Sequence, residues 1–168
     1  DMNFESRNDV REEEYIEMIR LKTSVLLACA LKAGALIADA PKEDCELLYQ
    51  FGEKIGLAFQ LQDDYLDVYG DPKVFGKTIG GDIMSNKKTY MLINAFSRAN
   101  AQQRAQLQQW VHHPDAHPAE KVAAVTQLYN EIGVDQLAQA KINEYFQRSK
   151  QYLDAVNVDE QRKQELRQ

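Results

Sequence analysis

The spacing of the apolar residues restricts the fold most strongly, because it follows the period of an α-helix through nearly the whole chain. Between Glu12 and Ala38, for example, apolar side chains mostly recur every three or four residues. No segment alternates apolar and polar residues strongly enough to predict a strand. We therefore expect an all-α fold, in which the chain forms part of a large helical bundle around a central cavity.

Proline and glycine set the ends of the expected helices. A second helix should run from about residue 42, just after Pro41, to residue 69, where Gly70 and Pro72 stop it. Residues 72–86 contain three glycines and are predicted to form a loop. Further helices are expected over residues 87–99, 100–111, 119–131, 134–156 and 158–168, with a turn at 112–118. The three histidines near that turn, His112, His113 and His117, are better explained as exposed loop residues than as a metal site.

Composition limits the possible partners and surroundings. The 168 residues are enough for one domain with a core, and a hydrophobic content of 44% with 27% charged residues is typical of globular proteins. A net charge of −6 without a long basic run argues against nucleic acid as a partner. The apolar stretch at residues 25–30 is far too short for stable membrane insertion. With no visible signal peptide, we expect a cytoplasmic protein.

Two further sequence features lead to specific expectations. Cys29 and Cys45 both fall on apolar sides of predicted helices, so we interpret them as small core residues rather than as a disulfide or a metal site. The chain begins at Asp1 without an initiator methionine. We expect that start to reflect a cut inside a longer protein.

An acidic face on the second helix is the clearest chemical signal. At 100° per residue, Gln60, Asp63, Asp64 and Asp67 fall within an arc of roughly 100°. Carboxylates on one face repel each other, and aspartate has a low helix propensity. A solvated acidic face would normally carry Lys or Arg four residues away, and this stretch has none. We therefore predict that these aspartates bind Mg²⁺, which prefers oxygen ligands and is often shared with substrate phosphates.

Lysines near this helix would suit an anionic ligand. Lys77 follows Gly76, and Lys87 comes shortly after a glycine pair in the loop. A nucleotide-binding P-loop is excluded, because the required glycine five positions before Gly76 is replaced by Asp71. Lys22, in the first helix, is followed by Thr23. Both a solvated lysine and an inward-facing one are compatible with that position.

These features, taken in order, resemble the trans-isoprenyl diphosphate synthase family, which includes farnesyl and geranylgeranyl diphosphate synthases. The resemblance covers roughly residues 12–95 and is looser beyond them. It rests on these residues: Lys22-Thr23, Phe59-Gln60, the DDxxD of Asp63, Asp64 and Asp67, Gly70-Asp71-Pro72, Gly76-Lys77, Gly80-Gly81-Asp82-Ile83 and Asn86-Lys87.

The resemblance implies a function and a role for each residue. Family members join an allylic diphosphate to isopentenyl diphosphate through Mg²⁺-assisted ionisation of the allylic substrate. Asp63 would ligate Mg²⁺, with Asp64 and Asp67 completing its shell directly or through water. Lys22, Lys77 and Lys87 would hold the diphosphate, and Lys87 could pair with the aspartates instead. Thr23 and Gln60 would line the pocket near the reacting carbons, and Phe59 would be a further substrate-binding residue.

The chain departs from the family pattern in one respect. The family has two aspartate-rich motifs on facing helices, and only the second is found here. Residues 1–168 therefore resemble the C-terminal half of one all-α prenyltransferase domain, whose full-length form would be a homodimer. We expect the half alone to be inactive. The alternatives are a non-catalytic partner subunit of a prenyltransferase and a related terpene cyclase or head-to-head synthase.

Overall fold

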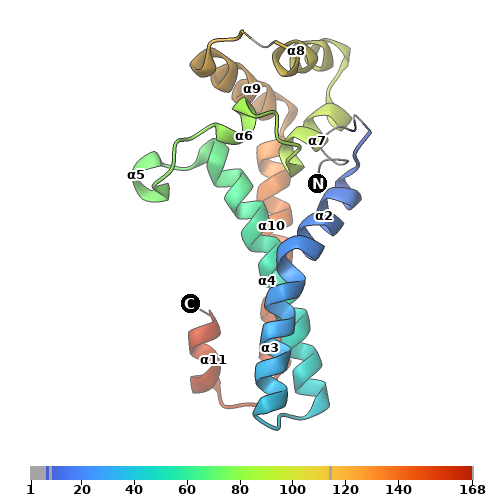
Figure 1. Ribbon diagram of the computed structural model, residues 1–168, viewed down its shortest axis with the longest axis vertical. Helices are drawn as coiled ribbons and strands as arrows, with labels where there is room; N and C mark the ends of the chain where they lie inside the picture. The colour runs from blue at the N-terminus through green and yellow to red at the C-terminus, as the bar shows by residue number, and fades with distance from the viewer. Residues whose placement is uncertain (1–6, 8, 114, 168) are drawn as a thin grey trace. The chain divides into compact units, whose positions relative to one another are not determined.

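A computed structural model of the chain describes residues 7, 9–113 and 115–167 (Figure 1). All regular secondary structure in these ranges is helical, which confirms the all-α prediction. Pro114 and Gln168, which fall in the predicted turn and the predicted last helix, lie outside the described residues. The elements are α2 (Glu12–Ile19), the π-helix η1 (Arg20–Ser24), α3 (Val25–Ile37), α4 (Lys42–Tyr69), α5 (Pro72–Phe75), α6 (Gly81–Met84), α7 (Tyr90–Arg98), α8 (Ala101–Val111), α9 (Pro118–Ile132), α10 (Val134–Ala155) and α11 (Glu160–Arg167).

The structure differs from the predicted helix pattern in three segments. The helix expected from about residue 87 begins only at Tyr90, because the Thr89 side chain caps it by accepting a hydrogen bond from the N–H of Leu92. The single helix expected from residue 12 to 38 contains the π-helical turn η1, closed by a hydrogen bond from the backbone N–H of Val25 to the carbonyl of Arg20. The expected loop 72–86 contains the short helices α5 and α6. Each spans only four residues, too few to show a helical period.

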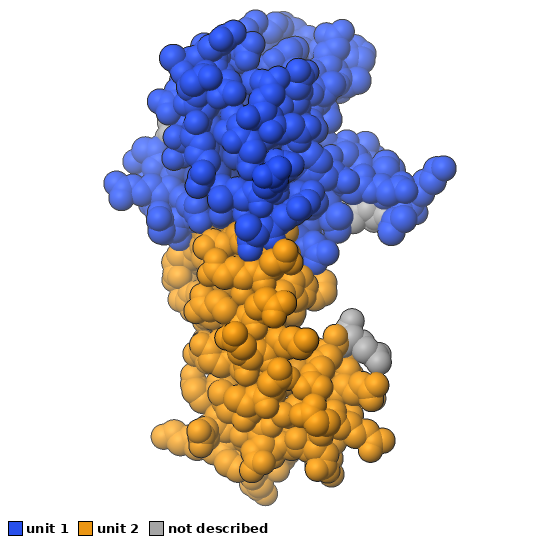
Figure 2. Space-filling model, turned by 180° about the vertical axis from the view of Figure 1, so that it is seen from behind, with its two compact units in different colours: residues 1–15, 61–140 blue, residues 16–60, 141–168 orange. Residues whose placement is uncertain are grey.

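The chain forms two compact units, which Figure 2 shows in different colours. Unit 1 comprises residues 1–15 and 61–140, and unit 2 comprises residues 16–60 and 141–168. Helices α4 and α10 contribute residues to both units. No described helix combines the length and apolar character required to cross a bilayer.

In unit 2, close packing of α3 and η1 on α4 depends on two glycines. A Cβ atom at Gly52 would lie 2.8 Å from the Cα of Ala28, and one at Gly56 would lie 2.9 Å from the Cα of Ser24. Any larger residue at either position would force the backbones apart. Small residues therefore define the contact between these helices.

The two cysteines differ in environment. Cys45 is buried and its thiol lies 3.6 Å from the carbonyl oxygen of Ala40, as expected of a core residue. Cys29 is exposed, so its interpretation as a core residue was wrong. The buried strip of α3 is narrow and includes Ala28 and Ala35, so apolar character alone did not identify the face of α3 that is buried.

The core of unit 1 is built around α7. Residues 90–95 of this helix are all buried, and α7 contacts both α8 and α9. The neighbouring helices contribute the buried side chains Leu107 from α8 and Val125, Leu128 and Tyr129 from α9. This core supports the loop between α6 and α7, which carries Lys87.

Candidate functional site

The three aspartates of the DDxxD sequence occupy one end of α4 but have different environments. The side chain of Asp63 is 52% exposed, whereas that of Asp64 is only 2% exposed. Asp67 is half-buried. The shared helix face predicted from their spacing therefore contains one carboxylate open to solvent and one that is almost completely enclosed.

Asp64 is held by two protein donors. The Tyr15 hydroxyl donates a hydrogen bond to Oδ2, and Nζ of Lys87 lies 3.0 Å from Oδ1. Burial raises the pKa of Asp64 to about 6, and the charge of Lys87 opposes this rise. Because each oxygen already has a donor within the protein, Asp64 connects α2, α4 and the loop before α7.

Asp67 fixes the start of α6. Its Oδ2 accepts a hydrogen bond from the backbone N–H of Asp82 (2.8 Å), and its carbonyl accepts one from the N–H of Gly80 (2.6 Å). The side-chain oxygen of Asp67 thus satisfies one donor that a short helix leaves unpaired at its N-terminus, and the Asp67 carbonyl satisfies the N–H of Gly80 just before the helix. The glycine-rich segment is therefore attached directly to the end of α4.

Two lysines lie beside the aspartates. Nζ of Lys77, on a side chain 66% exposed, lies 3.9 Å from Oδ1 of Asp63. Nζ of Lys87 lies between Asp64 and Asp82, at 3.0 and 3.7 Å. Burial acts to lower the pKa of Lys87, but the charge and hydrogen bond of Asp64 together with the charges of Asp82 and Asp63 outweigh burial, and the pKa is raised. Unit 1 thus presents an exposed carboxylate–ammonium pair next to a more enclosed one.

The carboxylates near the end of α4 suit a metal cation that takes few ligands from the protein. Across residues 7, 9–113 and 115–167, no group of three or more His, Cys, Asp and Glu side chains is arranged to hold a metal ion. Asp63 nevertheless offers an exposed carboxylate of the kind that Mg²⁺ prefers. Magnesium commonly uses one or two carboxylates and completes its shell with water and phosphate oxygens. Asp63, with Asp67 beside it, fits that pattern better than Asp64 does.

The other predicted site residues belong to unit 2. Lys22 and Thr23 are exposed on η1, and π-helical turns frequently occur at functional sites. On α4, Phe59 is 63% exposed and Gln60 is half-buried. The contacts described above therefore bring together only the three aspartates, Lys77 and Lys87.

Sequence reasoning missed two residues that contact the aspartates or their lysine. Tyr15 lies within the apolar pattern of the first predicted helix, although a buried tyrosine hydroxyl normally needs a partner. Asp82 was named only within the sequence that carries the resemblance and was given no role, but its backbone N–H donates to Asp67 and its side chain lies near Lys87. The polar atoms of these two residues were the available signal.

The described fold is all-α, and carboxylate and ammonium groups lie side by side at the end of α4. The family model for polyprenyl synthetase matches residues 1–132. The chain therefore belongs to the polyprenyl synthetase family.

Individual relatives agree with that assignment. A short chain isoprenyl diphosphate synthase of Methanothermobacter thermautotrophicus is 37% identical over 162 residues, covering 96% of this chain and 49% of that protein. A crystal structure of a geranylgeranyl pyrophosphate synthase matches with a TM-score of 0.90 and 37% identity, over 99% of this chain and 52% of that one. A geranylgeranyl pyrophosphate synthase from Corynebacterium glutamicum, complexed with isoprenyl diphosphate and magnesium, matches with a TM-score of 0.89 at 29% identity, over 99% of this chain and 47% of that one. The chain thus spans about half the length of the relatives it matches.

Proposed function

We propose that this chain supplies the second aspartate motif and the diphosphate-binding lysines of a chain-elongating prenyltransferase. The reaction would condense an allylic diphosphate with isopentenyl diphosphate. The observation that carries the proposal is the exposed pair of Asp63 and Lys77 beside the enclosed pair of Asp64 and Lys87. Such a pattern suits an anion that arrives with Mg²⁺, because it offers both a carboxylate for the metal and ammonium groups for phosphate oxygens.

Each side chain would have a defined role in the ionisation step. Mg²⁺, when bound, would offset the negative charge that develops on the departing diphosphate. Asp63 would hold the metal, and Lys77 would donate hydrogen bonds to the diphosphate oxygens from its exposed position. Lys87 would stabilise the same charge from the inner side of the site.

The candidate residues of unit 2 would contact both the diphosphate and the hydrocarbon part of the substrate. Lys22 would bind the diphosphate, and the Thr23 hydroxyl and Gln60 amide would face the reacting carbons. Phe59 is exposed and would provide apolar contact for the prenyl chain. Exclusion of water from this region would protect the allylic cation from capture. The homodimer implied by the resemblance is part of this proposal, and so is the expected cytoplasmic location.

The first test is binding of magnesium and inorganic pyrophosphate to the 168-residue chain, measured by isothermal titration calorimetry. We expect Asp63→Ala to weaken binding by at least about tenfold, or some 1.4 kcal/mol. Asp159→Ala removes another exposed aspartate, near the end of unit 2, and serves as the matched control. Equal affinities for the wild type and Asp63→Ala would refute the metal role.

The second test is turnover with magnesium, an allylic diphosphate and isopentenyl diphosphate. Since the chain spans about half of its relatives, we expect residues 1–168 alone to show negligible activity. In a protein that contains this sequence together with a first aspartate motif, Asp63→Ala should lower the rate by orders of magnitude. A loss of less than about tenfold there would contradict the proposal.

A further inference from the structure

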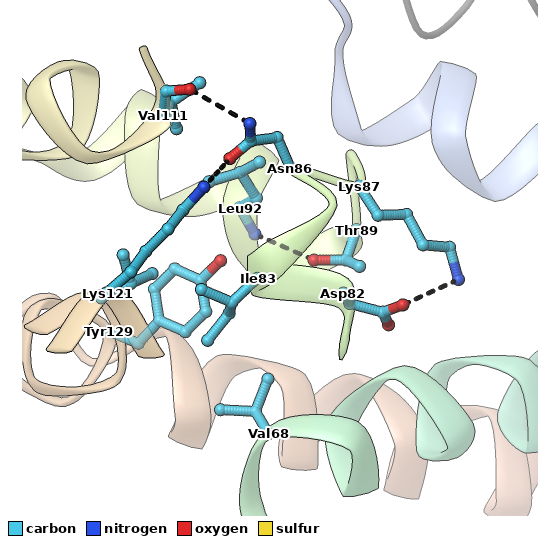
Figure 3. A pocket seen from close by; sticks show the side chains of 11 residues that line it. Val68, Asp82, Ile83, Asn86, Lys87, Thr89, Leu92, Val111, Lys121 and Tyr129 are labelled. Carbon is cyan, nitrogen blue, oxygen red and sulfur yellow. Dashed lines mark hydrogen bonds and ion pairs between the residues drawn. The ribbon is translucent and has the colours of Figure 1, made fainter. Parts of the chain in front are cut away.

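Helix α9 contains a buried lysine that has no place in the proposed ionisation step. Lys121 is only 5% exposed, and burial lowers its pKa. Nζ donates a hydrogen bond of 2.6 Å to Oδ1 of Asn86 (Figure 3). Buried lysines are rare, and a neutral amide compensates an ammonium group less well than a carboxylate would. The position of Lys121 therefore needs an explanation.

The cavity beside Lys121 is too small for a substrate. Its volume is about 10 Å³, and it is lined in part by Val68, Val125 and Tyr129. That volume corresponds to roughly one water molecule. A direct role of Lys121 in binding a ligand within this cavity is therefore excluded by size.

Asn86, the partner of Lys121, is held from both sides. Its Nδ2 donates a hydrogen bond of 3.0 Å to the carbonyl of Val111, near the end of α8, while its Oδ1 accepts from Lys121 on α9. The backbone of Asn86 has a φ of +54°, in the left-handed region that most residues avoid. The two side-chain hydrogen bonds thus fix a residue whose backbone conformation is unfavourable by itself.

The residue that follows Asn86 is Lys87. Its N–H donates to the carbonyl of Asp82 (2.9 Å), and its Nζ reaches Asp64 and Asp82. The direction in which the Lys87 side chain leaves the loop depends on the backbone of Asn86 directly before it. A change of conformation at Asn86 would redirect Lys87 away from Asp64.

Helix α9 also supports the other end of the same loop. Gly80 packs so closely on Val122 that a Cβ atom at Gly80 would lie 2.7 Å from a Val122 methyl group. Lys121 and Val122 are consecutive, so one turn of α9 contacts residues on both sides of α6. This arrangement gives the loop a rigid support outside the charged site.

We propose that Lys121 is a positioning residue, which fixes Asn86 between α8 and α9 and thereby directs Lys87 toward Asp64. The importance of this role for diphosphate binding rests on the proposed function. The positioning itself depends only on contacts within unit 1 and is testable without a ligand.

The direct test is NMR of the lysine ammonium groups in the 168-residue chain, at low temperature and neutral pH, with Lys87 assigned through Lys87→Arg. We expect the wild type to show a shifted, slowly exchanging Lys87 signal because Lys87 is ion-paired. In Lys121→Met, which keeps the side chain long and apolar, this signal should move to the position of a solvated lysine. Lys150→Met, at an exposed site on α10, is the matched control and should leave the signal unchanged. An unchanged Lys87 signal in folded Lys121→Met would overturn the proposal.

A second variant, Asn86→Gly, tests the same proposal if Lys121→Met does not fold. Asn86→Gly allows the left-handed backbone but removes both side-chain hydrogen bonds. It should release Lys87 in the same way, and an unchanged Lys87 signal in this variant would also count against the proposal.

Binding of magnesium pyrophosphate connects the positioning role to the site. Lys121→Met should lower the affinity for magnesium pyrophosphate by about tenfold, which is the loss expected when one charge-assisted hydrogen bond is removed. In a Lys87→Met background, Lys121→Met should have almost no further effect, because both changes remove the same contact. Independent, multiplicative losses would show a general structural role and refute positioning through Lys87. If the wild type binds no pyrophosphate while the Lys87 signal still responds, the proposed function fails and the positioning role stands.

Discussion

The hydroxyl of Tyr15 and the carboxylate of Asp64 form a buried hydrogen bond between residues 49 positions apart in the sequence. Tyr15 lies on α2, and Asp64 lies near the end of α4. This bond ties the start of the described helical region to the aspartate motif. It also leaves Asp63, rather than Asp64, as the aspartate most open to a ligand.

Removing the Tyr15 hydroxyl should destabilise the protein. In Tyr15→Phe the ring remains, but Oδ2 of buried Asp64 loses its donor, at a cost of about 1–3 kcal/mol in the free energy of unfolding. Urea denaturation measures this change. Tyr152→Phe removes the same group from a half-buried tyrosine on α10 and should change stability by less than about 0.5 kcal/mol. Equal stabilities of Tyr15→Phe and the wild type would show that the hydrogen bond contributes nothing.

The two lysines beside the aspartates, Lys77 and Lys87, should respond differently to truncation. Lys77→Met should weaken binding of magnesium pyrophosphate by about tenfold with little effect on stability, because Lys77 is 66% exposed. Lys87→Met should weaken binding and also lower stability by about 1–2 kcal/mol, since buried Asp64 loses a cation that is itself 40% exposed and partly screened. Calorimetry and urea denaturation measure the two effects separately. A stability loss in Lys77→Met as large as in Lys87→Met would contradict this division.

Gly80 should tolerate a side chain less well than Gly76. Both residues have positive φ, +91° and +70°, so alanine at either position costs about 1–2 kcal/mol in backbone strain. A Cβ at Gly80 would also collide with Val122, whereas one at Gly76 would have nothing within 4 Å. Gly80→Ala should therefore be less stable than Gly76→Ala by about 1–3 kcal/mol in thermal or urea unfolding. Combining Gly80→Ala with Val122→Ala should recover part of that difference, and no recovery would exclude the collision as its cause.

Stability should fall at alkaline pH in part because of Tyr129. Burial raises the pKa of this tyrosine above its ordinary value of about 10. The unfolded chain then releases the proton at a lower pH than the folded chain. The resulting stabilisation is complete below about pH 10 and is lost as the pH rises further. The free energy of unfolding, measured by urea denaturation between about pH 9 and 11, should fall less steeply in Tyr129→Phe. Equally steep curves would contradict this.

Local sequence signals determined much of the fold. The bounds predicted for α4, residues 42–69, match the structure because a proline at one end and Gly70 with Pro72 at the other act through the backbone itself. The same reasoning failed for α5 and α6, because a helix of four residues is too short to show a repeating pattern of apolar residues. It also failed for Cys29, since the sequence pattern did not show which part of α3 packs on α4.

For the candidate site, the sequence by itself determined which residue types are present and that three aspartates share one face of α4. The exposure of Asp63, the enclosure of Asp64 by Tyr15 and Lys87, and the support of Asn86 by Lys121 were decided only by the tertiary structure. Periodicity fixes the direction of a side chain around its own helix axis. The polar group that the side chain meets there comes from segments far away in the sequence, and their placement depends on the packing of the whole unit.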